Sequence, residues 1–408
     1  SIVRNDVQGP NQDGWEDCDD GNVLGGDNCS ANCHAEPNGI AMGPYHTCAT
    51  THEGPTYCWG AGTRGQLGHG AQASQSEPVR VATPVIFEAN QGGPGREIRT
   101  YFTQIAVGSY HTCGITAEGG HVMCWGWNNQ GQRGHGQRAP EFRTTPLLTA
   151  NNSSTQSLAL GSYHTCAIDD RGVIKCWGQN QFGQLGLGDT TNRYQPASLN
   201  AHRSDAVLST SSYITCSRTA SNVECFGSNT GYPMHPNQGG QEHAYTDPVR
   251  VTNTTRARDF AVGGTGHACE INQRYELDCW GNNSHGQSNP TSQSANRQTR
   301  RRLRTNLVSV ALGHRHGCAR TTQRTVVCWG DNSHDQLGRQ TPGLSRQPID
   351  QIEQTVGLVG VVELVASEFA NCARTQQNAI YCWGKNTHGQ LGDGTTLSRH
   401  TPRRVELY

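Results

Sequence analysis

Short apolar runs that end in glycine or serine return along the chain at near-regular intervals. A run of four or five apolar residues bounded by turn residues indicates a buried β-strand. Six runs are clear, and a weaker one, AVLSTS, lies at residues 206–211. The clear runs are IAMG (40–43), IAVG (105–108), LALG (158–161), FAVGG (260–264), VALG (310–313) and LVAS (364–367). The pattern therefore predicts seven repeats, each opened by one buried strand.

A pair of cysteines follows each apolar run, and its two members are 9 to 11 positions apart in the sequence. The pairs are Cys48 and Cys58, Cys113 and Cys124, Cys166 and Cys176, Cys216 and Cys225, Cys269 and Cys279, Cys318 and Cys328, and Cys372 and Cys382. In the third copy, the turn residues Asp170, Arg171 and Gly172 lie midway between the cysteines, which is typical of a β-hairpin. Opposed residues of such a hairpin lie about 4.5–5.5 Å apart, within reach of a disulfide. We expect one disulfide in each hairpin.

The compartment follows from the same cysteines. Histidines near them, as in HRHGC with His314, His316 and Cys318, leave a zinc site as the alternative, but Cys-x2-Cys knuckles are absent. In an oxidising environment, each cysteine pair forms a disulfide that contributes ~2–3 kcal/mol to the free energy of unfolding. We expect an extracellular or cell-surface protein, and the first residue, Ser1, fits a secreted chain from which a targeting segment has been removed.

Each repeat continues after its hairpin with two further signals. Trp-Gly follows the second cysteine in six copies, with Phe226 in the remaining one, and leads into glycine-rich turns such as GQLG at 65–68. A proline-led strand then ends the repeat at 78–81, 146–148, 196–199, 248–251, 348–350 and 402–407. Four short strands in about 53 residues is the size of a propeller blade. The predicted fold is an all-β, seven-bladed β-propeller over residues 40–408, after a cysteine-rich segment at 1–39.

The final strand predicts how the ring closes. Residues 402–407 follow the last hairpin, whereas no proline-led strand precedes the first one. An open array would leave an unpaired edge at both ends. We therefore expect the C-terminal strand to pair into the first blade.

The signature G-x-x-H-T, followed by W-G-x-N-x-x-G-Q-L-G-x-G, resembles the regulator of chromosome condensation repeat, whose members form seven-bladed propellers. The resemblance covers residues 40–408 and implies the fold more than the function, because this fold hosts exchange factors, ubiquitin ligase modules and a secreted bacterial inhibitor of β-lactamases. The paired cysteines and a pI of about 7.0 favour a secreted bacterial type over the nuclear exchange factor.

Residues 14–36, GWEDCDDGNVLGGDNCSANCHAE, resemble a cysteine-rich repeat of secreted myxobacterial proteins. Cys18, Cys29 and Cys33 match that repeat, and their pairing stays open because three cysteines cannot all pair internally. The odd thiol can link copies of the chain or stay reduced. Aspartates that could bind calcium, or that form turns and caps, are Asp17, Asp19, Asp20 and Asp27.

Composition narrows the partners. The formal net charge is −1, so no overall field draws the protein to nucleic acid. No stretch approaches the ~18 apolar residues of a membrane span. One local candidate for binding is the group of arginines in RQTRRRLR (297–304), which lies in a loop that is either solvated or able to recognise acidic groups. The other is a set of three large side chains that either anchor a partner or pack beneath their own loops. They are Arg300, Arg301, Arg302, Arg304, Phe87, Tyr232 and Met234.

Catalytic groups do not converge in the sequence. One repeat position carries histidine five times, at His46, His111, His164, His267 and His316, which favours structural hydrogen bonding inside each blade. No nucleophile elbow, acid–base pair or metal constellation is visible. We therefore expect no enzyme and no cofactor, but a secreted scaffold that binds a protein or glycan through inter-blade loops. The alternatives are a structural subunit of a filament or coat, assembled through the N-terminal segment, and, third, a secreted hydrolase or lyase.

Overall fold

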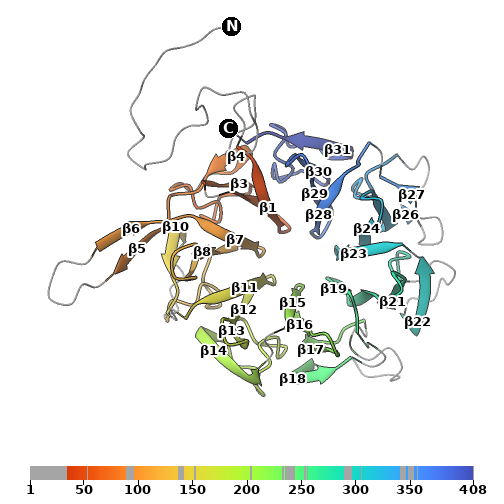
Figure 1. Cartoon of the computed structure of the whole chain (residues 1–408), viewed down its shortest axis with the longest axis horizontal. Helices are drawn as coiled ribbons and strands as arrows, with labels where there is room; N and C mark the ends of the chain where they lie inside the picture. Colours follow the sequence, from red (N-terminus) through yellow and green to blue (C-terminus); the bar gives the residue numbers. More distant parts are fainter. Residues whose placement is uncertain are drawn as a thin grey trace, which may run out of the picture.

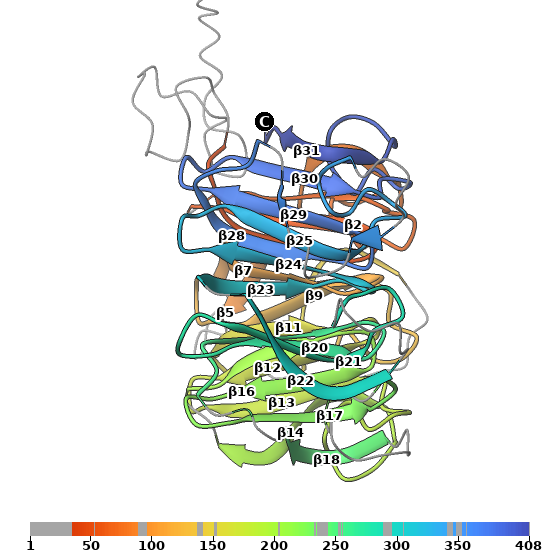
Figure 2. The same ribbon diagram turned by 90° about the vertical axis from the view of Figure 1, so that its right-hand side faces the viewer.

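Seven antiparallel sheets surround a central channel in the computed structural model (Figure 1). It describes residues 35–407 except 53, 89–95, 137–141, 151–152, 203–204, 232–233, 235–243, 252–253, 255, 289–295, 305, 341–345, 348–352 and 356. The first strand of each blade lies nearest the channel, and Figure 2 shows the ring from its side. The predicted fold class is confirmed.

The strands follow one another in sequence order within every blade. Blade 1 holds β1 (Pro37–Met42), β2 (His46–Thr51), β3 (Thr56–Gly60) and β4 (Gln75–Arg80). Blade 2 holds β7 (Phe102–Val107), β8 (His111–Thr116), β9 (Val122–Gly126) and β10 (Arg143–Leu148). Blade 3 holds β11 (Thr155–Leu160), β12 (His164–Asp169), β13 (Val173–Gly178) and β14 (Arg193–His202). Blade 4 holds β15 (Val207–Thr210), β16 (Ile214–Arg218), β17 (Val223–Ser228) and β18 (Ala244–Arg250).

Blade 5 holds β19 (Asp259–Gly263), β20 (His267–Ile271), β21 (Leu277–Asn282) and β22 (Asn296–Arg304). Blade 6 holds β23 (Leu307–Leu312), β24 (His316–Thr321) and β25 (Val326–Asp331), with β26 (Arg346–Gln347) and β27 (Glu353–Gln354) both paired to β25. Blade 7 holds β28 (Val361–Ala366), β29 (Ala370–Thr375), β30 (Ile380–Gly384) and β31 (Arg399–Val405). A separate hairpin, β5 (Val85–Glu88) and β6 (Arg96–Arg99), extends outward between blades 1 and 2 (Figure 1).

All seven predicted disulfides form, and each joins directly opposed positions on the second and third strands of one blade. The Cα atoms of the bridged pairs lie 4.0 to 4.2 Å apart. Every bridge is buried, so the sulfurs add apolar volume to the contacts between blades as well as a covalent link. From blade 1 to blade 7, the bridges are Cys48 to Cys58, Cys113 to Cys124, Cys166 to Cys176, Cys216 to Cys225, Cys269 to Cys279, Cys318 to Cys328 and Cys372 to Cys382.

The predicted ring closure is wrong in its strand pairing. The C-terminal strand β31 pairs with β30 of its own blade, and blade 1 is completed by β1. The ring closes through side-chain packing instead: Met42 and Trp59 of blade 1 share a hydrophobic cluster with Leu391 and Leu407 of the chain's end. One backbone hydrogen bond, from Ala35 N to Leu407 O at 3.0 Å, adds to this seam.

A repeated polar contact joins neighbouring blades at five of the seven junctions, those where Trp59, Trp125, Trp177, Trp329 and Trp383 donate to the preceding blade. The indole nitrogen of Trp125 donates to the carbonyl oxygen of Gln66 in the preceding blade at 2.9 Å, and Trp59 makes the same bond to Gln390 across the seam at 3.0 Å. The glycine of the intervening turn is required, because a Cβ on Gly68 would lie 2.6 Å from that indole nitrogen and the residue has a φ of +72°. The Gly-Gln-Leu-Gly turn is therefore the socket for the next blade's tryptophan.

The repeat histidines also act between blades, which corrects the expectation of bonding inside each blade. The Nε2 atom of His111 lies 2.9 Å from Thr165 Oγ1 of the next blade, and that hydroxyl donates to Gln132 O. Since the threonine proton is used on the carbonyl, the Nε2 nitrogen of His111 is the donor in this bond. Burial lowers the pKa of His111 to about 3. The same bond links His46 to Thr112, and His164 to Thr215.

Candidate binding site at the channel mouth

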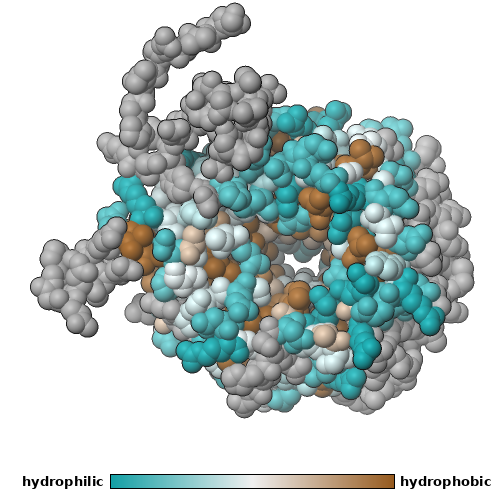
Figure 3. Space-filling model, in the orientation of Figure 1, coloured by the Kyte–Doolittle hydropathy of each residue, from teal (hydrophilic) through white to brown (hydrophobic). Residues whose placement is uncertain are grey.

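The channel opens between the turns that join the first and second strands of the blades. Most residues that line its mouth are small, and a Cβ added to Gly43 would lie 2.4 Å from Gly108 O, so blades 1 and 2 approach too closely at this position for a side chain on residue 43. The space at the mouth is about 480 Å³, open solvent included. Figure 3 shows the opening at the centre of the molecule, with hydrophobic side chains gathered around it.

In six of the seven blades, the residue before the repeat-histidine position directly follows a residue that lines this mouth. It is aromatic in five of the seven blades, as Tyr45, Tyr110, Tyr163, Tyr213 and Phe369. Blades 5 and 6 carry Gly266 and Arg315 at the same position. All five aromatic side chains are partly exposed, whereas the neighbouring histidine positions are buried.

Blades 1 to 3 bring the aromatic residues into one cluster, which we call the aromatic rim: Tyr45, Tyr110, Tyr163, Trp127 and Arg64. The rings of Tyr45 and Tyr110 stack with centroids 4.9 Å apart. Trp127 meets Tyr110 edge-on at 5.5 Å and Tyr163 at 6.0 Å. The guanidinium of Arg64 lies 4.1 Å from the centre of the Trp127 ring. Stacking and cation–π contacts thus hold partly exposed aromatic side chains in fixed positions.

Two tyrosines of the rim, Tyr45 and Tyr163, have raised pKa values. A hydrogen bond with Tyr110, together with burial, raises the pKa of Tyr45 far above its usual value. Burial likewise raises the pKa of Tyr163. Tyr45 and Tyr163 therefore offer neutral hydroxyl groups, and the rim adds apolar ring faces beside the cation Arg64.

Blades 6 and 7, which follow blade 1 on its other side, have a different chemistry. The ring centroid of Phe369 lies 4.6 Å from that of His334 and 5.6 Å from that of His314. The Lys385 ammonium lies 5.1 Å from the centre of the Phe369 ring. Burial raises the pKa of Glu368, which lines the mouth, while Lys385 opposes that shift. This side combines one carboxyl group with a lysine and two histidines, so the mouth is polar on blades 6 and 7 and aromatic on blades 1 to 3.

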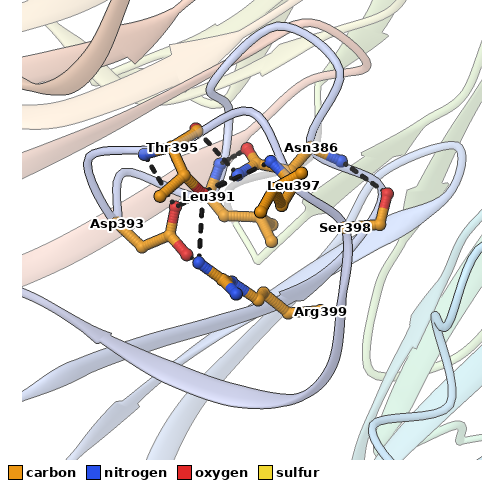
Figure 4. A network of polar contacts seen from close by, with 7 residues as sticks. All are labelled: Asn386, Leu391, Asp393, Thr395, Leu397, Ser398 and Arg399. Carbon is orange, nitrogen blue, oxygen red and sulfur yellow. Dashed lines mark hydrogen bonds and ion pairs between the residues drawn. The ribbon is translucent and has the colours of Figure 1, made fainter.

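The loops that carry these side chains are held by internal hydrogen bonds. In blade 7, Asn386 Oδ1 accepts from Leu391 N at 2.9 Å and its amide donates to Asp393 and to Thr395 O (Figure 4). Arg399 Nε lies 2.6 Å from Asp393 Oδ2. Burial would raise the pKa of Asp393, but the hydrogen bonds from Thr395 and Arg399 outweigh it and lower the pKa. Blade 3 repeats the arrangement with Asn180, Asp189 and Arg193.

The site residues expected from sequence fare differently. Of the two alternatives for Met234, the structure shows burial and not an exposed anchor: its side chain is fully buried in a cluster with Phe260 and Trp280. The segment 297–304 is not a loop but most of β22, the outer strand of blade 5. In the backbone register of this strand with β21, Arg302 lies opposite Asp278 and Arg301 lies opposite Cys279. Outside what the structure describes lie Tyr232, the side chains of Phe87, Arg300, Arg301, Arg302 and Arg304, and all of Asp17, Asp19, Asp20, Asp27, Cys18, Cys29 and Cys33.

Metal chemistry finds no support in the part of the chain that the structure describes. No group of three histidine, cysteine or acidic side chains is placed there to hold a metal ion. Cys318, the cysteine of the zinc alternative, is bound to Cys328 and so provides no thiolate. Within these same residues, no helix is long and apolar enough to cross a membrane.

The aromatic rim was missed at the sequence level although its signal is visible there. The motif G-S-Y-H-T-C places tyrosine directly before histidine in blades 2 and 3, but only the histidine was assigned a role from the sequence. Recognising the rim required knowing that this position faces the channel mouth in every blade. The second contribution, Arg64 and Trp127, comes from loops that differ between repeats and so leaves no periodic signal.

Comparison with known sequences gives one family. Two sequence profiles, both described as the regulator of chromosome condensation (RCC1) repeat, match the chain. One matches residues 53–115, 119–168, 172–219 and 377–407. The other matches residues 102–132, 156–184, 307–336 and 361–390. Together they cover more than half of the chain.

Individual relatives extend the similarity. The ultraviolet-B receptor UVR8 of Arabidopsis thaliana is 27% identical over 381 residues, which are 90% of this chain and 81% of the receptor. The E3 ubiquitin-protein ligase HERC2 of Mus musculus is 24% identical over 92% of this chain, but the chain spans only 7% of that ligase.

Solved structures support the fold alone. Yeast RCC1 (Prp20) bound to Kap60 superposes with a TM-score of 0.72 at 17% identity, covering 86% of this chain and 83% of that one. Prp20p of Saccharomyces cerevisiae, described with its binding to Gsp1p and histones, gives 0.71 at 18% identity, with 86% and 85% covered.

Proposed function

Because the chain belongs to the regulator of chromosome condensation repeat family, we propose that it is a non-catalytic binding propeller that holds a partner protein against the aromatic rim. The observation that carries the proposal is the cluster of Tyr45, Tyr110, Tyr163 and Trp127 around Arg64 at the channel mouth. Tyrosine, tryptophan and arginine are the residues that dominate the energetics of protein interfaces.

Preorganisation favours binding by this surface. The rings are already stacked and Arg64 is already seated on Trp127, so little side-chain freedom remains to be lost when a partner docks. The names of the relatives are consistent with partner binding: a receptor, a ligase, and a propeller crystallised with Kap60.

The proposed setting is extracellular. Seven buried disulfides support it, since such bridges persist in oxidising compartments and are rare in reducing ones. Assembly into a filament through the N-terminal segment stays the alternative, and it depends on residues 1–34, outside the described part of the chain.

Site-specific photo-crosslinking tests the proposal. One variant carries a photoreactive phenylalanine analogue in place of Phe182, whose ring centroid lies 5.0 Å from that of Tyr213 beside the mouth. A second variant carries the analogue in place of Arg171, in the β12–β13 turn at the other end of blade 3. Each variant is irradiated in an extract of the organism from which the protein comes. We expect one protein to be crosslinked from position 182 and not from 171, and the crosslink to weaken with Trp127→Ala. Equal labelling at both positions, or a product that is only a glycan, would refute a protein partner at the rim.

A further inference from the structure

An open concavity lies between blades 4 and 5 at the end of the ring opposite the aromatic rim. Strand β16 connects the two ends: Tyr213 precedes it at the channel mouth, and Arg218 is its last residue. The concavity is lined by Arg218, Ala220, Arg256, Ala257, Arg258 and Gln273, and its volume, including the open solvent above it, is about 1070 Å³. Three of its six lining residues are therefore arginines, and we call it the arginine cleft.

Side-chain contacts hold two of the cleft arginines, Arg218 and Arg258, and a backbone contact holds the third, Arg256. Arg218 Nη1 donates to Ala257 O at 3.2 Å, and the Arg258 guanidinium lies 4.2 Å from the centre of the Tyr275 ring. Arg256 has a backbone φ of 55°, uncommon for a residue with a side chain, and its carbonyl accepts a 2.7 Å hydrogen bond from Gln273 Nε2. Arg256 and Arg258 are both exposed to solvent.

None of these three arginines takes part in a salt bridge among the described residues. The acidic group nearest in sequence, Asp259, accepts hydrogen bonds from Phe260 N at 3.0 Å and Val310 N at 2.8 Å. Burial raises the pKa of Asp259, which disfavours its negative charge, although the charge of Arg218 acts against that shift. Asp205 accepts from Ala220 N at 2.8 Å. The cleft is a local concentration of positive charge on a chain whose formal net charge is −1.

We propose that the arginine cleft is a second binding site, which takes the sulfate or carboxylate groups of an acidic polysaccharide. A guanidinium presents a fork of N–H donors that matches the paired oxygens of these groups. The open shape admits a substituent carried on a polymer, and the Tyr275 face is already occupied by Arg258, so no ring is left there for stacking a nucleic-acid base. The site stands apart from the rim and does not depend on the function proposed for it.

Binding of defined polymers to the full chain tests this site. The probes are dextran sulfate, polygalacturonate and neutral dextran, with single-stranded DNA as a polyanion of another class, each titrated by isothermal calorimetry. We expect dextran sulfate or polygalacturonate to bind, neutral dextran not to bind, and DNA to bind at least ~10-fold more weakly than the better acidic polysaccharide. The two charged polysaccharides distinguish a sulfate ligand from a carboxylate ligand.

Variants locate the binding. The double variant Arg256→Gln/Arg258→Gln should bind the preferred polysaccharide ~10-fold or more weakly, the loss expected from two charge-assisted contacts. Arg171→Gln removes the same charge from the β12–β13 turn on the same face and should bind as the parent does. Trp127→Ala should also leave this affinity unchanged, which separates the cleft from the rim.

Four results would overturn the site: no binding of either acidic polysaccharide by the parent chain, undiminished binding by the double variant, an equal loss with Arg171→Gln, or DNA binding as tight as that of dextran sulfate. Because both substituted side chains are exposed, the double variant should keep the parent's melting temperature, and Arg258→Glu provides a single-site variant in which a charge reversal should weaken binding further than Arg258→Gln does.

Discussion

The buried histidines make the stability of the ring depend on pH. Burial lowers the pKa of His46, His111, His164 and His267 to about 3, below their ordinary value of 6.5. The unfolded chain therefore binds protons more tightly than the folded one between these values, so the free energy of unfolding is fully present above about pH 6.5 and decreases as pH falls towards 3. Each such histidine contributes a slope of up to ~1.4 kcal/mol per pH unit.

Denaturant unfolding at pH 7.5, 6 and 5 measures this slope. His164→Ala should show a smaller loss of the free energy of unfolding between pH 7.5 and 5 than the parent. Alanine is chosen because Ala370 occupies the corresponding buried position in blade 7. A parent protein equally stable at pH 7.5 and 5 would contradict the assignment of neutral, buried histidines.

Tryptophan is replaceable at its socket at a modest cost. In Trp177→Phe, the bond from the indole to Gln132 O is lost, but Thr165 Oγ1 still donates to that oxygen, so no buried acceptor is left alone. Blade 4 shows that a phenylalanine, Phe226, fills the position. We expect the free energy of unfolding to fall by about 1 kcal/mol, measured by urea titration. A loss above about 3 kcal/mol would show that packing, not the hydrogen bond, decides this contact.

At the scale of the strand, one disulfide holds the middle of every blade. Replacing Cys166 and Cys176 together by alanine opens a loop with a sequence separation of 10, for which chain entropy predicts a loss of about 2.7 kcal/mol. Thermal and urea unfolding measure that loss, with the parent in the same buffer for comparison. An unchanged midpoint would mean that cross-strand pairing alone maintains the hairpin.

Sequence patterns predicted the inner strands and missed part of the outer layer. The first strand of each blade is buried among its neighbours, so its apolar run is unmistakable, and the cysteine spacing reports directly on the hairpin that follows. The outer strand β22 has neither proline nor an apolar run, because a strand at the edge of a sheet buries few of its side chains. The aromatic rim depends on which loops converge in space, information that spacing along one chain does not contain.

Connectivity of the whole ring predicts tolerance of new chain ends. Each blade is complete in sequence, and Ala35 N lies 3.0 Å from Leu407 O, so the two ends of the propeller already meet. A circular permutant that begins at Ser154, between blades 2 and 3, with residue 408 joined to Ser1 breaks no sheet. We expect it to fold and to unfold in one cooperative transition, followed by circular dichroism. An insoluble permutant would indicate that the native seam is needed to start folding.

The placement of the disulfides also determines how the protein responds to a pulling force. A bridge joins the second and third strands of each blade, while the first and fourth strands carry none. Under tension between the two ends of the chain, a blade can lengthen only by the segments outside its disulfide. The hairpin between the two cysteines, whose sequence separation is 9 to 11, cannot be extended while the disulfide is intact. A propeller built this way would lengthen in short steps under force and would refold from hairpins that are still linked by their disulfides.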